Sequence, residues 1–279
     1  GMAFKGVSEI PPTAVVEDKI QYQPHPMLAH YRFLHAQVPL GHTAKFTIPS
    51  PAMAHMRGGS QAIPKHIYPK LEQYWQDLAA AYQAAIADFY AAGCRYLQID
   101  DITFAYLADP KVQAMCRDHG DDPMQLHQVY AEVLQQALSQ RPKDMLITMH
   151  TCRGNFQSTW VAAEPYQEAI VKSLFSCPVD AFFMEFDSER AGGFDILQHL
   201  PADKHVVLGL ITSKTGTLED PQHLITRIEQ AAQQVPLERL ALSPQCGFSS
   251  THHGNHLSEA EQWAKLAHVV KVANAVWKQ

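Results

Sequence analysis

The chain has 279 residues, 46% of them hydrophobic and 18% charged, so it is long enough to bury the core of one large globular domain. Its formal net charge of -6 gives no basic surface for nucleic acid, and no apolar run approaches the ~20 residues of a membrane span. Five cysteines in a chain that begins without a signal-peptide pattern indicate a reducing, cytoplasmic setting rather than a disulfide framework.

Helices and strands are predicted to alternate along the chain. Residues 1–40 are expected to form an irregular, proline-marked lead-in with a short strand at Thr13–Glu17 and a helix at Met27–Gln37. Six strands follow, at Thr43–Pro49, Arg95–Asp100, Met145–His150, Ala181–Glu185, His205–Ile211 and Arg239–Ser243. Helices are expected at Tyr68–Ala92, Pro110–His119, Pro123–Gln140, Glu164–Phe175, Phe194–Leu200, Pro221–Val235 and Ser258–Trp277.

This alternation, without hairpin signals, predicts an α/β fold with parallel strands and helical crossovers. The two candidate architectures are a doubly wound sheet and a (β/α)8 TIM-type barrel. The Gly-rich dinucleotide fingerprint is absent after the first strand, which favours the barrel. We therefore predict a single βα-barrel domain over residues 1–279, in which only six βα units are evident.

The strand ends carry the polar residues, and functional side chains of βα barrels lie at the carboxyl ends of strands. His150 and Cys152 stand two residues apart, so an extended backbone points both to the same side. The other strand ends carry Asp100-Asp101, Glu185, Lys214 and Cys246.

Four of these side chains, His150, Cys152, Glu185 and Cys246, form a nitrogen, sulfur, oxygen and sulfur set that suits tetrahedral zinc. Each alone has a plainer interpretation, such as a salt-bridged carboxylate, a small buried cysteine or an aspartate that caps the next turn. Their joint placement on one face of the barrel predicts the metal site. The remaining residues of metal-binding type are expected to serve packing, at Cys94, Cys116 and Cys177, or a polar loop, at His252, His253 and His256.

The same residues resemble the catalytic domain of cobalamin-independent methionine synthase. The resemblance rests on His150-x-Cys152, on Glu185 and on Cys246-Gly247, in that order, and on Gln98-Ile-Asp100-Asp101. It extends from about Pro12 to Val276. It implies a (β/α)8 barrel, and zinc held by His150, Cys152, Glu185 and Cys246. It also places Asp100, with Asp101 beside it, at the amino-acid substrate, whose amino group Asp100 would bind.

The implied reaction is that of a 5-methyltetrahydropteroyltriglutamate–homocysteine S-methyltransferase, which moves a methyl group from 5-methyltetrahydrofolate to homocysteine in methionine biosynthesis. Both substrates are small molecules. Lys214 stands where the synthases carry a histidine, so it is the candidate proton donor; its alternative is a surface contact with an anion. The large N-terminal duplicate barrel of the synthases is absent, as in short homologues of the family, which leaves the methyl donor open.

Two barrel strands that carry further homocysteine contacts in the family are not evident. Either the chain is a fragment, or another segment or a subunit of a homo-oligomer closes the barrel. Two other functions stay open. A metal-free decarboxylase of the uroporphyrinogen type would not need the His-x-Cys and Cys-Gly pairs. A barrel that binds zinc or a thiol without turnover would differ from the transferase in a methyl-transfer assay.

Overall fold

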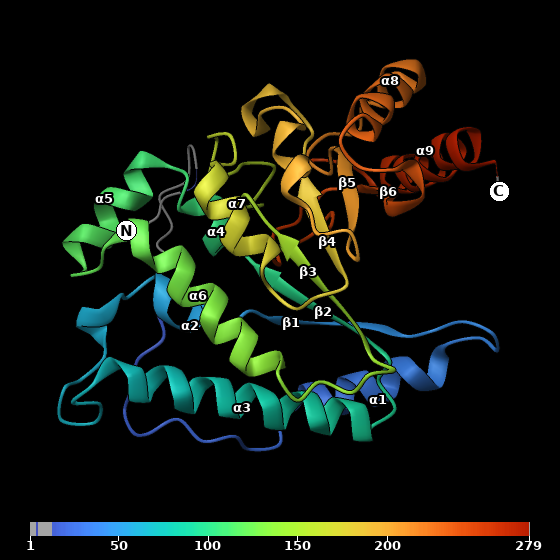
Figure 1. The fold of residues 1–279 in the computed structure, drawn as a ribbon. Coiled ribbons are helices and arrows are strands. Elements are labelled where there is room, and N and C mark those ends of the chain that lie inside the picture. Colours follow the sequence, from blue (N-terminus) through green and yellow to red (C-terminus); the bar gives the residue numbers. More distant parts are fainter. Residues whose placement is uncertain (1–3, 5–12, 279) are drawn as a thin grey trace.

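One parallel sheet of six strands forms the centre of the computed structural model, which describes residue 4 and residues 13–278 (Figure 1). The strands stand in the order of the sequence, and every neighbouring pair is parallel. They are β1 (Lys45–Pro49), β2 (Tyr96–Asp101), β3 (Leu146–Thr151), β4 (Ala181–Glu185), β5 (His205–Ile211) and β6 (Leu240–Pro244).

Helices fill every connection between the strands. The α-helices are α1 (Met27–Gln37), α2 (Met53–Met56), α3 (Leu71–Ala91), α4 (Thr103–Tyr106), α5 (Pro110–Asp118), α6 (Pro123–Leu138), α7 (Glu168–Phe175), α8 (Pro221–Ala232) and α9 (Glu259–Trp277). Short 3-10 helices lie at η1 (Ser60–Ala62), η2 (Glu189–Ala191), η3 (Asp195–His199) and η4 (Leu237–Arg239). Within the described residues, no helix has the length and apolar character needed to cross a bilayer.

Local sequence explains where several helices begin. Asp109, Asp122 and Asp220 each precede a proline, and each carboxylate accepts the backbone N–H two residues further on. Proline suits the first helical position because its missing N–H would have no partner there. Ser258 and Glu261 form a capping box at the start of α9. These signals account for the close agreement between predicted and observed helix starts.

The predicted fold class and the six predicted strands are confirmed, and some details are wrong. Residues 13–17 form no strand, because no neighbouring strand pairs with them. The helix predicted from Glu164 begins only at Glu168, after Pro165, and the helix predicted at 194–200 is the 3-10 helix η3. The part of the predicted lead-in at residues 1–3 and 5–12 lies outside the described residues.

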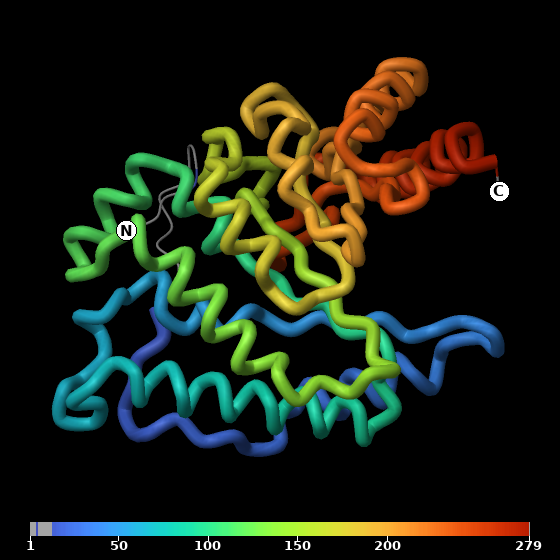
Figure 2. Tube along the Cα trace, in the orientation of Figure 1, coloured from blue at the N-terminus to red at the C-terminus, as the bar shows by residue number. Residues whose placement is uncertain are grey.

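The two faces of the sheet differ in their surroundings. On β2, Leu97 and Ile99 are fully buried against the helical layer, whereas Tyr96, Gln98 and Asp100 on the opposite, inner face are half-buried. The chain trace shows the long helices α3 and α6 side by side on the outer side of the sheet (Figure 2). The core therefore lies between sheet and helices, and the inner face remains available for a site.

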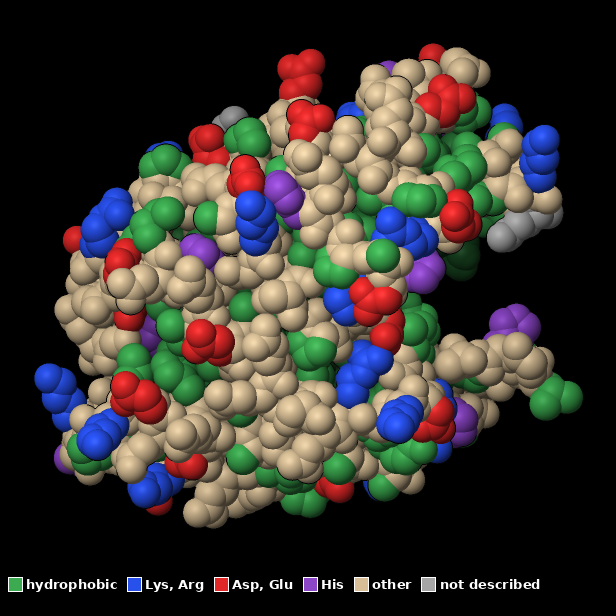
Figure 3. All heavy atoms as spheres, viewed as in Figure 1, with side chains coloured by type: hydrophobic (Ala, Val, Ile, Leu, Met, Phe, Trp, Pro, Cys, Tyr) green, Lys and Arg blue, Asp and Glu red, His purple; other side chains and the backbone are tan. Residues whose placement is uncertain are grey.

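The sheet is open among the described residues, because β1 and β6 each pair with only one strand. The surface is hollowed between the part that carries α8 and α9 and the segment that leads from α1 into β1 (Figure 3). On the exposed inner face, the Lys45 ammonium lies 4.1 Å from the ring centre of Phe183 and 5.2 Å from that of Tyr96. The fold is thus of the (β/α)8 type, with six βα units among the residues that the structure describes.

A buried histidine outside the sheet ties α2 to α6. His55 is 2% exposed, and its ring nitrogens lie 2.9 Å from the Tyr130 hydroxyl and 3.2 Å from that of Ser60. Asp121 lies 3.7 Å away. Burial lowers the pKa of His55 from 6.5 to about 4; the Asp121 charge opposes this shift and His119 adds to it. His55 is therefore neutral in the folded protein at neutral pH.

This shift makes stability depend on pH. Between pH 6.5 and 4, His55 binds a proton in the unfolded chain but not in the folded protein. His55 therefore does not reduce the unfolding free energy above pH 6.5, and it reduces that free energy progressively as the pH falls toward 4. The loss from this group is about 3 kcal/mol. We expect the unfolding free energy of His55→Gln to fall less between pH 7.5 and pH 4.5 than that of the wild type, as measured by urea unfolding at the two pH values. Equal pH dependence in both proteins would contradict the assignment.

Candidate metal centre

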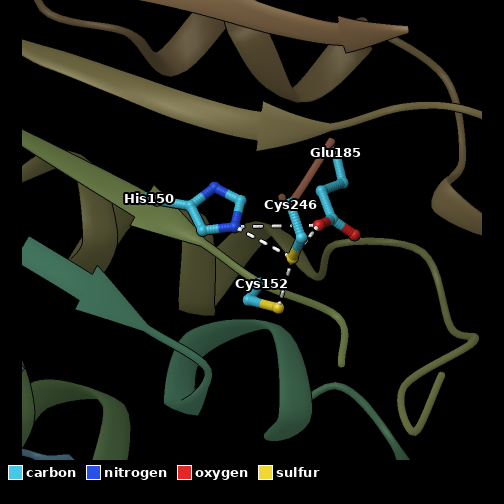
Figure 4. Close-up of side chains that lie close together, drawn as sticks. All are labelled: His150, Cys152, Glu185 and Cys246. Carbon is cyan, nitrogen blue, oxygen red and sulfur yellow. Dashed lines mark hydrogen bonds and ion pairs between the residues drawn. The ribbon is translucent and has the colours of Figure 1, made fainter. Parts of the chain in front are cut away.

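Four side chains from three strand ends converge at one edge of the sheet (Figure 4). His150 lies in β3 and Cys152 directly after it, Glu185 is the last residue of β4, and Cys246 follows β6. One nitrogen, two sulfur atoms and one carboxylate oxygen, one from each side chain, all lie within 4.8 Å of one another. The structure thus brings together the four residues that the sequence predicted as a set.

Strand geometry explains the convergence. His150 and Cys152 point to the same side because they are two residues apart in an extended segment. Glu185 pairs with Gly209 of β5, where an added Cβ would lie 3.0 Å from the Met184 carbonyl oxygen and 3.4 Å from the Cα of Glu185. Glycine at this position therefore lets the backbones of β4 and β5 approach closely beneath the site.

The sulfur of Cys246 is the centre of the cluster. It lies 2.9 Å from the Cys152 sulfur and 3.4 Å from Nε2 of His150, and it donates to Oε1 of Glu185 at 3.0 Å. The backbone N–H of Gly154 donates to the Cys152 sulfur at 3.2 Å. These contacts come from loops and strands that are far apart in the sequence, so the cluster exists only in the folded chain.

The cluster holds an excess of negative charge. The contact with the Cys246 thiol lowers the pKa of Cys152, and the same contact, together with burial, raises the pKa of Cys246 well above its ordinary value. Burial alone would lower the pKa of His150, but hydrogen bonding to Cys152 and the charges of Cys152, Glu185 and Asp100 raise it to about 9. The direction of the His150 shift shows that the neighbouring sulfur and carboxylate groups favour a positive charge at this place.

The donor set fits a zinc ion. Glu185 is completely buried, and its Oε2 has no hydrogen-bond partner among the described residues. A buried carboxylate is costly unless it is paired or coordinates a metal. Two sulfurs, one imidazole nitrogen and one carboxylate oxygen are ligands that zinc takes in tetrahedral sites. The chemistry of these four residues therefore suits zinc better than calcium or magnesium, which prefer oxygen ligands.

Comparison with known proteins assigns the chain. The sequence profile described as "Cobalamin-independent synthase, Catalytic domain" matches residues 43–275. The chain belongs to this family. Two uncharacterized proteins of Bacillus subtilis (strain 168), YxjH and YxjG, are each 44% identical over 279 and 280 residues, which is 100% of this chain and 73% of each relative.

Solved structures agree with the family. A Listeria monocytogenes protein, provisionally assigned as a vitamin-B12-independent methionine synthase, is 38% identical with a TM-score of 0.73, over 93% of this chain and 72% of its own. A B12-independent methionine synthase of Shewanella sp. W3-18-1, solved in complex with selenomethionine, is 18% identical with a TM-score of 0.68. This match covers 92% of this chain and 68% of the Shewanella chain. The second likeness concerns the fold alone.

A cavity of about 410 Å³ adjoins the ligand set of this synthase-family domain. Its lining includes Lys45 and Phe183 of the inner face, and Gln245 beside Cys246. Sequence reasoning missed these three residues as cavity residues. For Lys45 and Phe183, a signal existed in the strand alternation, since each stands on the inner face of its strand with polar or aromatic neighbours.

The two predicted substrate residues have different surroundings. Asp100 belongs to the inner face, and the Gln98 amide donates to its Oδ1 at 2.7 Å. Asp101 follows on the opposite side of the strand, is 1% exposed, and its Oδ1 accepts from the backbone N–H groups of Thr103 and Phe104 at the start of α4. Asp101 also borders the cavity, but its hydrogen bonds are those of a helix-capping residue.

Lys214, the predicted proton donor, is buried outside the cavity lining. Its ammonium donates to Oε1 of Gln245 at 2.8 Å, and Gln245 lines the cavity. The alternative prediction of a surface anion contact is therefore wrong, because the side chain is only 5% exposed. The structure thus places Lys214 next to a residue that lines the cavity.

The other cysteines and histidines behave as predicted. Cys94, Cys116 and Cys177 are free and buried, and burial raises the pKa of each thiol. His252 and His253 are exposed, and neither joins a group of three or more metal-type ligands in the part of the chain that the structure describes. The four converging side chains are thus distinct from the packing cysteines.

Proposed function

We propose that this chain is a zinc-dependent methyltransferase that transfers a methyl group to a small thiol, homocysteine first. The proposed donor is 5-methyltetrahydrofolate or a related methyl compound, and the product is methionine. The proposal adds zinc, substrates and residue roles to the family membership. Five free cysteines are consistent with a reducing compartment, and we place the enzyme in the cytoplasm as part of the proposal.

The observation that carries the proposal is the convergence of His150, Cys152, Glu185 and Cys246 beside a cavity of about 410 Å³. These four residues would hold the zinc ion. When bound, zinc would supply a Lewis acid that keeps the acceptor sulfur in its thiolate form, the nucleophile, at neutral pH. A metal-free decarboxylase gives no reason for this ligand set.

Asp100 would orient the acceptor. It pairs with His150 in the register of β2 and β3, and both side chains line the same cavity. An acceptor whose ammonium group binds Asp100 would therefore have its thiol end near the ligand set. This arrangement suits a short amino acid with a side-chain thiol.

Lys214 remains the proposed proton donor to the leaving methyl donor, and its contact with Gln245 defines what that role requires. The ammonium must release Gln245 or move past it to reach the cavity. In the present geometry it fixes the orientation of the Gln245 amide, which borders the same space as Cys246. We therefore propose two functions for Lys214: it orients the Gln245 amide, and it donates a proton once it has released that amide.

Metal analysis combined with a methyl-transfer assay tests the function. We expect close to one equivalent of zinc after chelator treatment and reconstitution, and methyl transfer from methylated folate to homocysteine only in the reconstituted protein. Zinc binding without turnover, with methylated folate and with simpler methyl donors, would favour a binding barrel. Less than about half an equivalent of zinc would count against the metal site itself.

A further inference from the structure

The loops that carry the two cysteines are joined by one asparagine. Asn155 lies three residues after Cys152 and is 6% exposed. Its amide nitrogen donates to the carbonyl of Gly247, the residue after Cys246, at 2.8 Å, and to the Ser250 hydroxyl at 2.7 Å. Its amide oxygen accepts from Asn255 at 2.9 Å. Every one of these bonds crosses from the loop after β3 to the loop after β6.

Asn255 extends this connection to a third loop. Its amide nitrogen donates to Asn155 and, at 2.9 Å, to the carbonyl of Ser213 after β5. Its amide oxygen accepts the backbone N–H of Ser158 at 3.0 Å. The amide nitrogen and the amide oxygen of both asparagines are therefore hydrogen-bonded, and the two side chains together link the loops that follow β3, β5 and β6.

Ser158 holds the same three loops from the other side. Its hydroxyl donates to the Lys214 carbonyl at 2.7 Å and accepts the backbone N–H of His256 at 2.8 Å. Gln157 and Ser158 have φ values of 45° and 63°, a left-handed conformation that residues other than glycine rarely adopt. Such strain persists only where surrounding contacts enforce it, and it is common at functional sites.

The four ligands are not held equally by the sheet. His150 and Glu185 belong to strands, whereas Cys152 and Cys246 stand beyond the strand ends. The backbone N–H of Cys152 still donates to the Asp101 carbonyl of β2 at 2.7 Å, so the sheet holds Cys152 more firmly than Cys246. The last ladder-type bond before Cys246 runs from the Gln245 N–H to the Ile211 carbonyl at 2.9 Å. The position of the Cys246 sulfur therefore depends on what holds the loop after β6 against the loop after β3.

We propose that Asn155 and Asn255 are positioning residues that hold the two cysteine loops at the separation required for metal binding. This inference rests on the proposed metal site and deepens it. Neither asparagine belongs to the cavity lining or to the four converging side chains. They act by fixing Gly247 and thereby the backbone of Cys246. Side chains that orient metal ligands in this way typically contribute 10- to 100-fold in metal affinity.

Zinc affinity, measured by competition with a chromophoric chelator, tests the proposal. Asn155→Ala and Asn255→Ala are expected to weaken zinc binding by about 10- to 100-fold. The double variant should lose less than the product of the two single losses, because the two residues share one hydrogen bond. Cobalt substitution adds a second readout, because the sulfur-to-cobalt absorption bands should shift or weaken when the two thiolates are misplaced.

Gln83→Ala is the matched control. The Gln83 amide donates to the Gln136 carbonyl at 2.7 Å and to the Ser139 hydroxyl at 3.2 Å, and it bridges α3 and the end of α6 away from the site. We expect this variant to lower the unfolding temperature of the metal-free protein without changing zinc affinity. If the control weakens zinc binding as much as Asn155→Ala does, the effect is general destabilisation and the proposal fails.

The possible outcomes distinguish the proposed metal site from the proposed asparagine clamp, which is the pair Asn155 and Asn255 that joins the two cysteine loops. If wild-type protein binds no zinc, the proposed function fails and the clamp with it. If wild-type protein binds zinc and the asparagine variants bind it within twofold, only the clamp is wrong. Should both alanine variants fail to fold, Ser158→Ala, which removes one donated bond and one accepted bond, is the milder test and is expected to weaken zinc binding severalfold.

Discussion

Replacing Cys246 by serine is expected to lower zinc affinity by about 100- to 1,000-fold. Four-ligand zinc sites have apparent binding free energies of about 10–16 kcal/mol, so an even share for one ligand is about 2.5–4 kcal/mol. Cys246 contacts all three other ligand side chains, so no other residue of the set can take its place. Methyl transfer should fall with the bound metal, measured at fixed low zinc.

Cys116→Ser is the control for this experiment. The exchange is the same, the residue is 2% exposed, and its position near the end of α5 is outside the cavity lining. We expect it to cost stability but to retain one equivalent of zinc. If Cys246→Ser retains zinc as tightly as Cys116→Ser does, Cys246 is not a ligand and the proposed metal centre is wrong.

The convergence of the four metal-type side chains could be predicted because each member stands at a position that local rules define. The apolar strand pattern located the ends of β3, β4 and β6, and the two-residue period placed His150 and Cys152 on one side. Parallel strands bring their carboxyl ends to one edge, so Glu185 was expected beside β3, and the curvature of a βα barrel was expected to bring Cys246 toward the same point. The prediction needed no long-range contact beyond the topology itself.

The sequence did not settle which of the two adjacent aspartates at the end of β2 faces the inner side of the sheet. Asp100 and Asp101 have the same side chain, and the predicted strand ended between them. The observed β2 continues through Asp101, which turns that carboxylate away from the inner face and toward α4. The short helices α2 and α4 were not predicted, because four residues are too few for a helical hydrophobic period.

Hydrogen bonds between loops that are far apart in the sequence could not be predicted from the sequence. Asn155 and Gly247 are 92 residues apart, and nothing local to either residue predicts their hydrogen bond. Lys214 was correctly placed beyond strand five, but its direction depends on Gln245 in the loop after β6. Such residues follow from the relative positions of loops, which only the assembled barrel defines.

Asp100→Asn is expected to lower kcat/KM for homocysteine by about 10- to 150-fold, because hydrogen bonds to charged groups contribute about 1.5–3 kcal/mol. The reason is the loss of the negative charge that would bind the ammonium group of the acceptor. Asparagine keeps the size of the side chain and can still accept from the Gln98 amide. The loss should appear mainly in KM, measured with the zinc-loaded enzyme, because Asp100 is not one of the four converging metal-type ligands.

Asp101→Asn is the neighbouring control, since asparagine can still cap α4 through its side-chain oxygen. We expect it to change kcat/KM for homocysteine by less than about threefold, well under the effect expected from losing a hydrogen bond to a charged group. A second control changes the acceptor: 4-mercaptobutanoate has the thiol of homocysteine but no amino group. For this acceptor, wild type and Asp100→Asn should have equal kcat/KM, because the group that Asp100 would bind is missing. If the Asp100→Asn penalty persists with 4-mercaptobutanoate, the carboxylate acts on something other than the amino group, and the proposed orientation of the acceptor is wrong.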